Sequence, residues 1–160
     1  MGCTSTPAIQ APSTRPNGQW ISAVAATCYP PAGWLPEPLK SSDRHAHQIW
    51  VSPSRRTAYG VIHFSLPLPM TDEMALWGFL REMKRTEGAA DLLNKKPNQG
   101  SPGMQFEAAG GLYRIRANLE SHGWQAWVWY AATVVEQPIE TRELIDAEVA
   151  RDQTIIGPPQ

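Results

Sequence analysis

The sequence predicts an α+β fold, in which helices pack on an antiparallel β-sheet. Two segments carry helix signals, 71–88 and 140–153, and the other regular runs are short and rich in β-branched and aromatic residues. Their order is three strands, a helix, three more strands and a second helix. This order favours an antiparallel sheet that ends in a three-stranded meander and is flanked by two main helices.

The composition fits one globular domain and argues against several classes of protein. With 160 residues, 42% of them hydrophobic, the chain can bury a core of its own. Its net charge is −1 and no basic run stands out, so we expect no nucleic-acid partner. No run approaches the roughly 20 apolar residues of a bilayer helix. The two cysteines form no CxxC motif, and Cys28 lies in an apolar run that predicts its burial.

The chain divides into three segments. Residues 1–17 contain three prolines and several serines and threonines without hydrophobic periodicity, which predicts a flexible N-terminal tether. Residues 18–156 carry the strand and helix patterns and form the predicted α+β domain. Residues 157–160 form a short tail.

The domain is expected to begin with strands. Residues 19–29 fit one strand, which ends where the stretch PPAGWLPEP, with four prolines in nine residues, forbids regular structure. Trp34 in this stretch is the predicted anchor of a loop. Two further strands, 47–52 and 57–66, are joined around SPSRR.

The first helix has the strongest local signals. Thr71 is the expected N-cap, acidic residues follow it in the first turn, and Gly88 is placed to stop the helix. Its apolar face comprises Met74, Trp77, Leu80 and Met83.

The second helix is expected to be apolar at Leu144, Ile145 and Val149. The acidic balance of 136–152 predicts a solvated helix face, with a docking surface as the alternative.

The runs MQFEAA, LYRIRANLE and WQAWVWYAATVV form the predicted meander. A symmetric turn at ESHG sets Ile115 opposite Val128, and a two-residue turn at the Gly-Gly pair sets Phe106 opposite Ile115. These apolar pairs define one face of the meander as the core face.

The other face of the meander carries a predicted ladder of arginine and tryptophan. Arg116 is expected opposite Trp127 and Arg114 opposite Trp129, with Glu107 beside Arg114. Such pairs suit cation–π stacking and could serve sheet stability alone. They could also form a platform for an anionic or aromatic ligand or for a partner's surface, so these four residues are the candidate interaction surface.

A histidine cluster is the candidate metal site. His45 and His47 share one face of an extended strand with Asp43, and an odd-length loop would place His63 opposite His47. Three imidazoles and a carboxylate could ligate zinc. An even-length loop would move His63 to the other face, and a fourth ligand is missing, so we predict no metal and no cofactor.

No pattern of catalytic residues is found. The sequence has no G-x-S-x-G motif, no cysteine with a placed histidine and no paired carboxylates in an apolar setting. Its Gly-rich stretch AAGGLYR lies between strands, where no helix N-terminus can cradle phosphate. We therefore expect a protein that is not an enzyme.

The element order resembles the PsbP-like fold, which includes an extrinsic photosystem II subunit, a nuclear Ran-release factor and many small bacterial envelope lipoproteins. The residues that carry the resemblance are YPPAGW, AYGVIHFSL before the helix DEMALWGFLREMK, and the meander around GGLYRIRANL and WQAWVWYAATVV. It covers roughly 18–156 and implies a binding or assembly module rather than an enzyme. No functional residue of the family can be transferred.

These observations together predict a non-enzymatic extracytoplasmic lipoprotein that acts as a binding or assembly module in the bacterial cell envelope. A lipid would anchor it in the membrane, and its partner would be an envelope protein that the sequence does not identify. The alternative is a small-molecule or metal-binding domain that uses the Arg/Trp sheet face or the histidine cluster.

The first residues carry the prediction of lipidation at Cys3. A bacterial lipobox ends in Gly or Ala before the modified cysteine, and a polar tether commonly follows, as it does after Gly2. Met-Gly-x-x-x-Thr also fits N-myristoylation at Gly2 with palmitoylation of Cys3, and an unmodified start is the third alternative. Expressed with its own signal peptide, the protein should partition with membranes, and Cys3→Ser should release it. Membrane fractionation checks this, and a Cys3→Ser protein that stays in the membrane fraction would contradict it.

Overall fold

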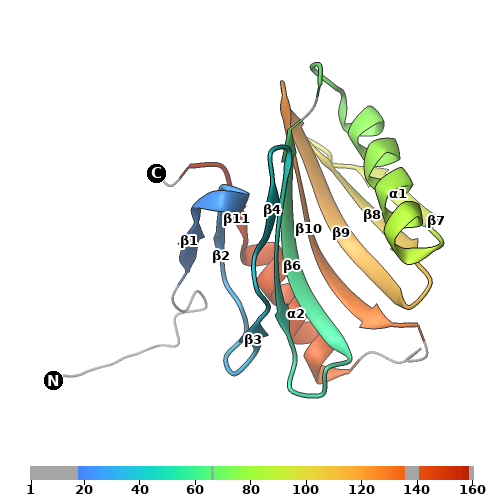
Figure 1. Cartoon of the computed structure of the whole chain (residues 1–160). Coiled ribbons are helices and arrows are strands. Elements are labelled where there is room, and N and C mark those ends of the chain that lie inside the picture. The colour runs from blue at the N-terminus through green and yellow to red at the C-terminus, as the bar shows by residue number, and fades with distance from the viewer. Residues whose placement is uncertain (1–17, 66, 136–140, 159–160) are drawn as a thin grey trace, which may run out of the picture.

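The computed structural model describes residues 18–65, 67–135 and 141–158 and confirms the α+β fold (Figure 1). The main sheet is antiparallel, in the order β3-β5-β6-β10-β9-β8-β7 with β4 also on β5. Its strands are β3 (Leu35–Pro36), β4 (Lys40–Ser42), β5 (His45–Val51), β6 (Thr57–Ser65), β7 (Asp91–Pro97), β8 (Met104–Ala109), β9 (Tyr113–His122) and β10 (Gln125–Val134). The helices are α1 (Asp72–Glu87) and α2 (Arg142–Gln153), and a small second sheet contains β1 (Gln19–Ile21), β2 (Ala26–Cys28) and β11 (Ile155–Ile156).

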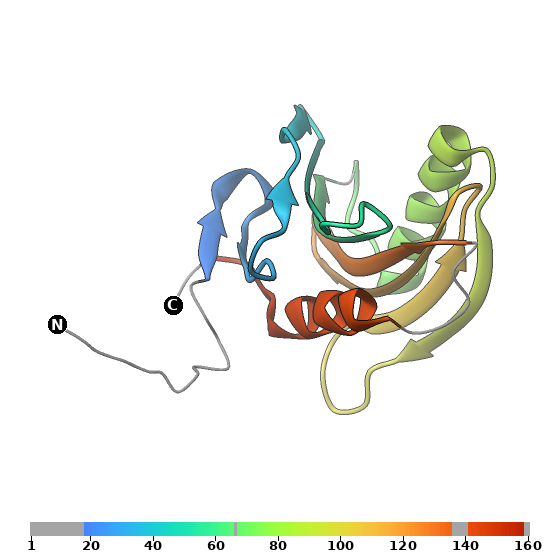
Figure 2. The ribbon, with the colours of Figure 1, turned by 90° about the horizontal axis from the view of Figure 1, so that it is seen from below.

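The two helices lie on opposite faces of the curved main sheet (Figure 2). We call these faces the α1 face and the α2 face. Leu76 and Leu80 of α1 belong to a core cluster on the α1 face, while Leu144 of α2 belongs to a second cluster on the α2 face. The sheet therefore separates two hydrophobic cores. Neither helix in the described part of the chain is long and apolar enough to cross a membrane.

The caps of α1 are confirmed, but its predicted apolar face is correct only at Leu80 and Met83. The Thr71 hydroxyl accepts a hydrogen bond from the Met74 amide at 3.2 Å, and Gly88 ends the helix with φ 82°. Met74 and Trp77 are 46% and 54% exposed, because the helix turns Leu76 toward the sheet instead. Trp77 lies beside the ammonium of Lys95 on β7, 5.9 Å from the ring centroid.

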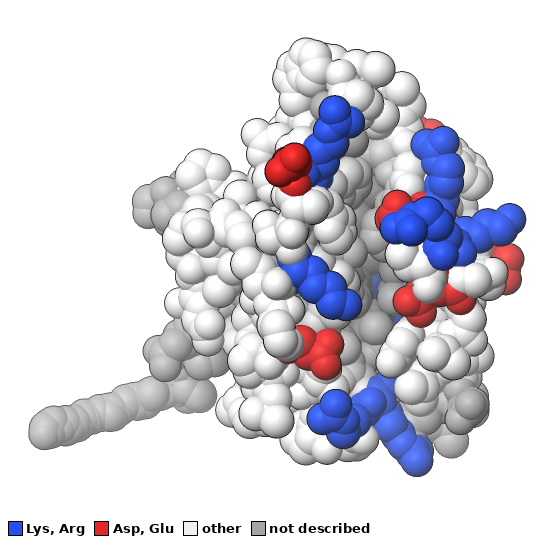
Figure 3. All heavy atoms as spheres, viewed as in Figure 1, with Lys and Arg blue, Asp and Glu red and all other residues white. Residues whose placement is uncertain are grey.

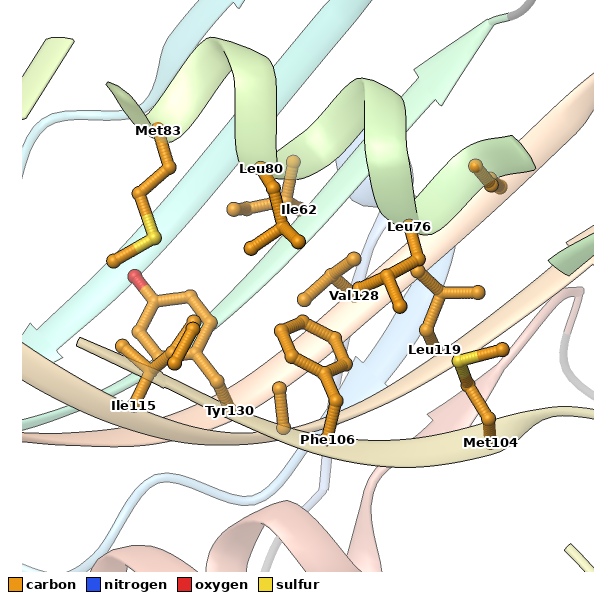
Figure 4. Packing of buried hydrophobic residues seen from close by; sticks show 14 of the residues in the cluster. Ile62, Leu76, Leu80, Met83, Met104, Phe106, Ile115, Leu119, Val128 and Tyr130 are labelled. Atoms are coloured by element: carbon orange, nitrogen blue, oxygen red, sulfur yellow. The ribbon is translucent and has the colours of Figure 1, made fainter. Parts of the chain in front are cut away.

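Figure 4 shows how α1 packs on the sheet. Leu76, Leu80 and Met83 point from the helix toward the strands, as their places in the core cluster indicate. The strand residues beneath them include Ile62, Met104, Phe106, Ile115, Leu119, Val128 and Tyr130. Leu76 is completely buried. The meander thus presents its apolar face to the helix, and the prediction of a core face is confirmed.

The single strand predicted at 19–29 is wrong. A 3-10 turn at Ser22–Val24 interrupts it, and Ala25 adopts a left-handed conformation with φ 48°. This reversal pairs β1 with β2 in a hairpin. The burial of Cys28 is confirmed, and Trp34, only 7% exposed, is the predicted loop anchor.

The last described strand pairs with this hairpin. β11 pairs with β2, and the fully buried Tyr59 of β6 lies beneath both. Its hydroxyl hydrogen-bonds the Thr154 hydroxyl at 2.5 Å and accepts a bond from the Tyr29 amide at 3.3 Å. One buried phenol thus joins the main sheet, the end of α2 and the N-terminal hairpin.

Both hairpin registers of the meander differ from the predicted ones. Phe106 lies opposite Ala117, two residues from its predicted partner, and Val128 lies opposite Leu119, four residues from its predicted partner. Because both displacements are even, every side chain stays on its predicted face.

Two further expectations are corrected. No strand was expected between the first helix and the meander, but β7 forms there as a largely exposed edge strand. In α2, Leu144 is buried as predicted, but Ile145 and Val149 are 44% and 50% exposed. Alanines take their places in the core, namely Ala147 and Ala150.

Candidate ligand-binding groove

A groove of about 920 Å³ lies between α1 and the α1 face of β4, β5 and β6. In Figure 3 the surface is hollowed along the middle of this face, and charged side chains stand on both sides of the hollow. The groove exists because one helix covers a wide sheet. α1 packs mainly over the meander, so the concave surface of β5 and β6 stays open to its side.

Small residues keep the groove open. Gly78 lies in the middle of α1 and lines the groove, and a Cβ built on it meets no atom within 4 Å. Glycine inside a helix costs about 1 kcal/mol relative to alanine. On the opposite wall, Ala58 and Ala132 occupy neighbouring positions on β6 and β10. The groove is therefore a consequence of side-chain size as well as of the curvature of the sheet.

The floor of the groove is apolar. Alternate residues of a β-strand face the same side of the sheet. β6 therefore contributes Ile62 and Phe64 to the floor, and β5 contributes Ile49 and Val51. The apolar lining includes Ile49, Ile62, Phe64, Phe79, Met83 and Ile115. Such a surface favours the hydrocarbon part of a ligand.

A buried polar pair lies within this apolar lining. The phenol of Tyr130 reaches from β10 across β6, where a Cβ on Gly60 would lie 2.5 Å from the phenol oxygen. Its Oη is joined by a 2.6 Å hydrogen bond to Nε2 of His47 on β5. Because residue 60 is a glycine, the phenol of Tyr130 has room to pass over β6 and reach His47.

Both members of this pair are uncharged near neutral pH. Burial, followed by the charges of His45 and Lys40, lowers the pKa of His47 to about 3. Burial, followed by Glu37 and Glu87, raises the pKa of Tyr130 above its usual value. The groove therefore offers a neutral hydrogen-bonding pair in an apolar setting.

The rim of the groove carries charges of both signs. Three cations and three carboxylates line it, namely Lys40, Arg55 and Arg85 and Glu37, Glu82 and Glu87. On α1, Glu82 and Arg85 form an exposed ion pair at the rim.

The three histidines do not form the candidate cluster, and the alternative of an even-length loop is the one observed. His45 and His47 share the α1 face, with ring centroids 6.2 Å apart. His63 lies opposite Ala46 and points to the other face, because the β5–β6 connection has the even-length pairing. There it hydrogen-bonds Gln125 at 2.7 Å. Within the described residues no group of three or more potential metal ligands is found.

The predicted pairing of the Arg/Trp ladder is wrong. All four side chains lie on the α2 face, but the β9–β10 register sets Arg116 opposite Ala131 and Trp127 opposite Glu120. None of the four residues is therefore paired across the strands as predicted.

The N-terminal hairpin and α2 cover the two tryptophans. Trp127 is 5% exposed, and its indole Nε1 donates to the carbonyl of Val24 at 3.0 Å. Trp129 packs partly buried against the core cluster of the α2 face. These rings serve the packing of the domain and offer no open platform.

The two arginines lie in ion pairs. Arg116 binds Glu148 of α2 at 2.7 Å, and Arg114 binds Glu107 at 2.7 Å, as expected for neighbours in the sheet. A shallow hollow of about 230 Å³ lies beside Arg116. The guanidinium side chains stay partly exposed, so their role in an interaction surface stays a prediction.

The groove residues Lys40, Gly60, Gly78 and Tyr130 were not predicted from the sequence. A glycine inside a strand or a helix is a signal of close approach or open space, and both glycines carry that signal. Cys3, the predicted lipidation site, lies outside the described residues. A scan against protein-family models and a search of the curated proteins give no match for this chain.

Proposed function

We propose that this domain binds a small, elongated and largely apolar molecule in the groove between α1 and β4 to β6. The observation that carries the proposal is the groove itself, about 920 Å³ with an apolar floor and one buried polar pair. Ligand sites in proteins typically have this volume, this apolar lining and a few convergent polar groups. A groove of this kind accepts a small ligand along its length.

The polar pair is suited to binding a ligand rather than to acid–base catalysis. A general acid or base works best when its pKa lies near the operating pH. The pKa values of His47 and Tyr130 are both displaced away from neutrality, one downward and one upward. Burial also raises the pKa of Cys28 to about 12, so this thiol is a poor nucleophile. We therefore propose a binding protein that is not an enzyme.

The cellular setting is proposed from the sequence. An envelope lipoprotein held by lipid at Cys3 would present its domain to ligands at a membrane surface. An assembly role with an envelope protein remains a prediction alongside ligand binding.

The proposal is tested with N-phenyl-1-naphthylamine, an uncharged fluorophore whose emission rises in apolar surroundings. The wild-type protein should increase its emission, and Gly78→Trp should weaken binding at least tenfold because the indole fills open space. Arg81→Trp is the matched control, since Arg81 is exposed on α1 and does not line the groove. Thermal unfolding would verify that both variants fold. No emission change with the wild type, or equal binding by Gly78→Trp, would contradict the proposal.

A further inference from the structure

The charges along the groove are arranged unevenly. Lys40 of β4 lies directly opposite His47 of β5, so both side chains project from the α1 face. Ser42 and His45 form the next pair along the same two strands. A cationic ammonium, a hydroxyl and two imidazoles are thus gathered at one place on the groove wall.

Lys40 is the cation of this part of the groove that acts on His47. The charges that act on His47 come from Lys40 and His45, and both disfavour a further proton on the imidazole. Among the described residues Lys40 has no ion-pair partner. Across the groove, the α1 side chains that face this site are those of Glu82 and Arg85, which pair with each other.

The carboxylates of the groove act on other partners. Glu82 pairs with Arg85 and also interacts with His45. Glu37 and Glu87 act on the phenol of Tyr130, which is hydrogen-bonded to His47. A ligand anion next to Lys40 would therefore gain an attractive charge, whereas next to Glu87 it would meet a repulsive one.

We propose that the ligand is a single-chain amphiphile with an anionic head group, such as an alkyl carboxylate. The head group binds at Lys40 and the neighbouring histidines, and the hydrocarbon chain lies on the apolar floor beneath α1. This inference rests on the proposed function and specifies its ligand class. Charge complementarity selects the head group, and the apolar lining selects the chain.

The experiment compares three ten-carbon ligands of different charge below their aggregation concentrations. Isothermal titration calorimetry at pH 7.5 should show decanoate binding at least tenfold more tightly than decyltrimethylammonium, with decan-1-ol between them. Affinity for alkyl carboxylates should rise roughly two- to fourfold for each added methylene.

The variant that locates the head group is Lys40→Met, which keeps an apolar stem and removes the charge. It should weaken decanoate binding about five- to tenfold and change decan-1-ol binding less than twofold. Arg44→Met is the matched control, because Arg44 is an exposed cation near β5 that does not line the groove. It should leave both affinities within twofold of the wild type.

The outcomes separate this inference from the proposed function. Equal affinity for the three ligands, preference for the cation, or equal losses from Lys40→Met and Arg44→Met would overturn the anionic head group. Binding of N-phenyl-1-naphthylamine without binding of decanoate would overturn it as well, while the groove would remain a ligand site. If the neutral fluorophore fails to bind, the proposed function itself is wrong.

Discussion

Gly60→Ala is expected to lower the free energy of unfolding by about 2 to 4 kcal/mol. The added Cβ would lie 2.5 Å from Oη and 2.6 Å from Cζ of Tyr130, so the phenol would have to leave its place. Its movement would break the 2.6 Å hydrogen bond to His47 and disturb a side chain that is only 6% exposed. Overpacking and a buried polar group without its partner each cost about 1 to 3 kcal/mol.

Urea unfolding followed by circular dichroism measures this effect. Gly78→Ala is the contrasting variant, because its Cβ meets open space and the helix gains stability of about 0.5 to 1 kcal/mol. Combining Gly60→Ala with Tyr130→Leu should cost less than the sum of the two single changes, since the shorter side chain relieves the clash. A Gly60→Ala protein as stable as the wild type would show that the phenol has room to move.

Acidification is expected to destabilise the domain through His47. The pKa of its imidazole is about 3 in the folded protein, against 6.5 for an unperturbed histidine. Between these values the unfolded chain binds a proton that the folded chain excludes, so stability is full above about pH 6.5 and falls as the pH approaches 3. The loss is at most about 1.4 kcal/mol for each pH unit.

Two measurements check this expectation. Urea unfolding at pH 6.5 and pH 4.5 should show that the wild type loses about 2 kcal/mol more than His47→Gln, which lacks the imidazole. In proton NMR spectra the ring signal of His47, assigned by its absence in the variant, should not titrate above about pH 4. A midpoint near 6.5 would mean that water reaches the ring freely.

Local chemistry made the helix ends and the faces of the meander predictable. Thr71 and Gly88 have strong cap preferences, and the alternation of apolar and polar side chains assigns each strand residue to a face. The pairing register was not predictable in the same way, because it depends on where each turn closes. Gly123 has φ 60° and begins the β9–β10 turn, whose centre lies two residues beyond the predicted one.

The Gly-Gly pair shows how tertiary contacts override turn chemistry. A Cβ on Gly111 would lie 2.5 Å from the carbonyl oxygen of Glu87, and one on Gly110 would lie 2.9 Å from Cε of Met83. These glycines admit the end of α1, and the hairpin closes one residue later, where the Gly110 amide bonds the Tyr113 carbonyl at 2.7 Å. The same placement of α1 decides where the groove lies. The groove residues can be read in the sequence, but their proximity in the fold could not be predicted from it.

The pairing of β11 with β2 has a consequence for how the domain opens. The last and first strands of the described chain lie in one small sheet, and Tyr59 bonds both the Tyr29 amide and the Thr154 hydroxyl. α2 therefore cannot peel away from the main sheet without also releasing the N-terminal hairpin. We therefore expect the backbone amides of these distant segments to exchange hydrogen together, as one cooperative unit.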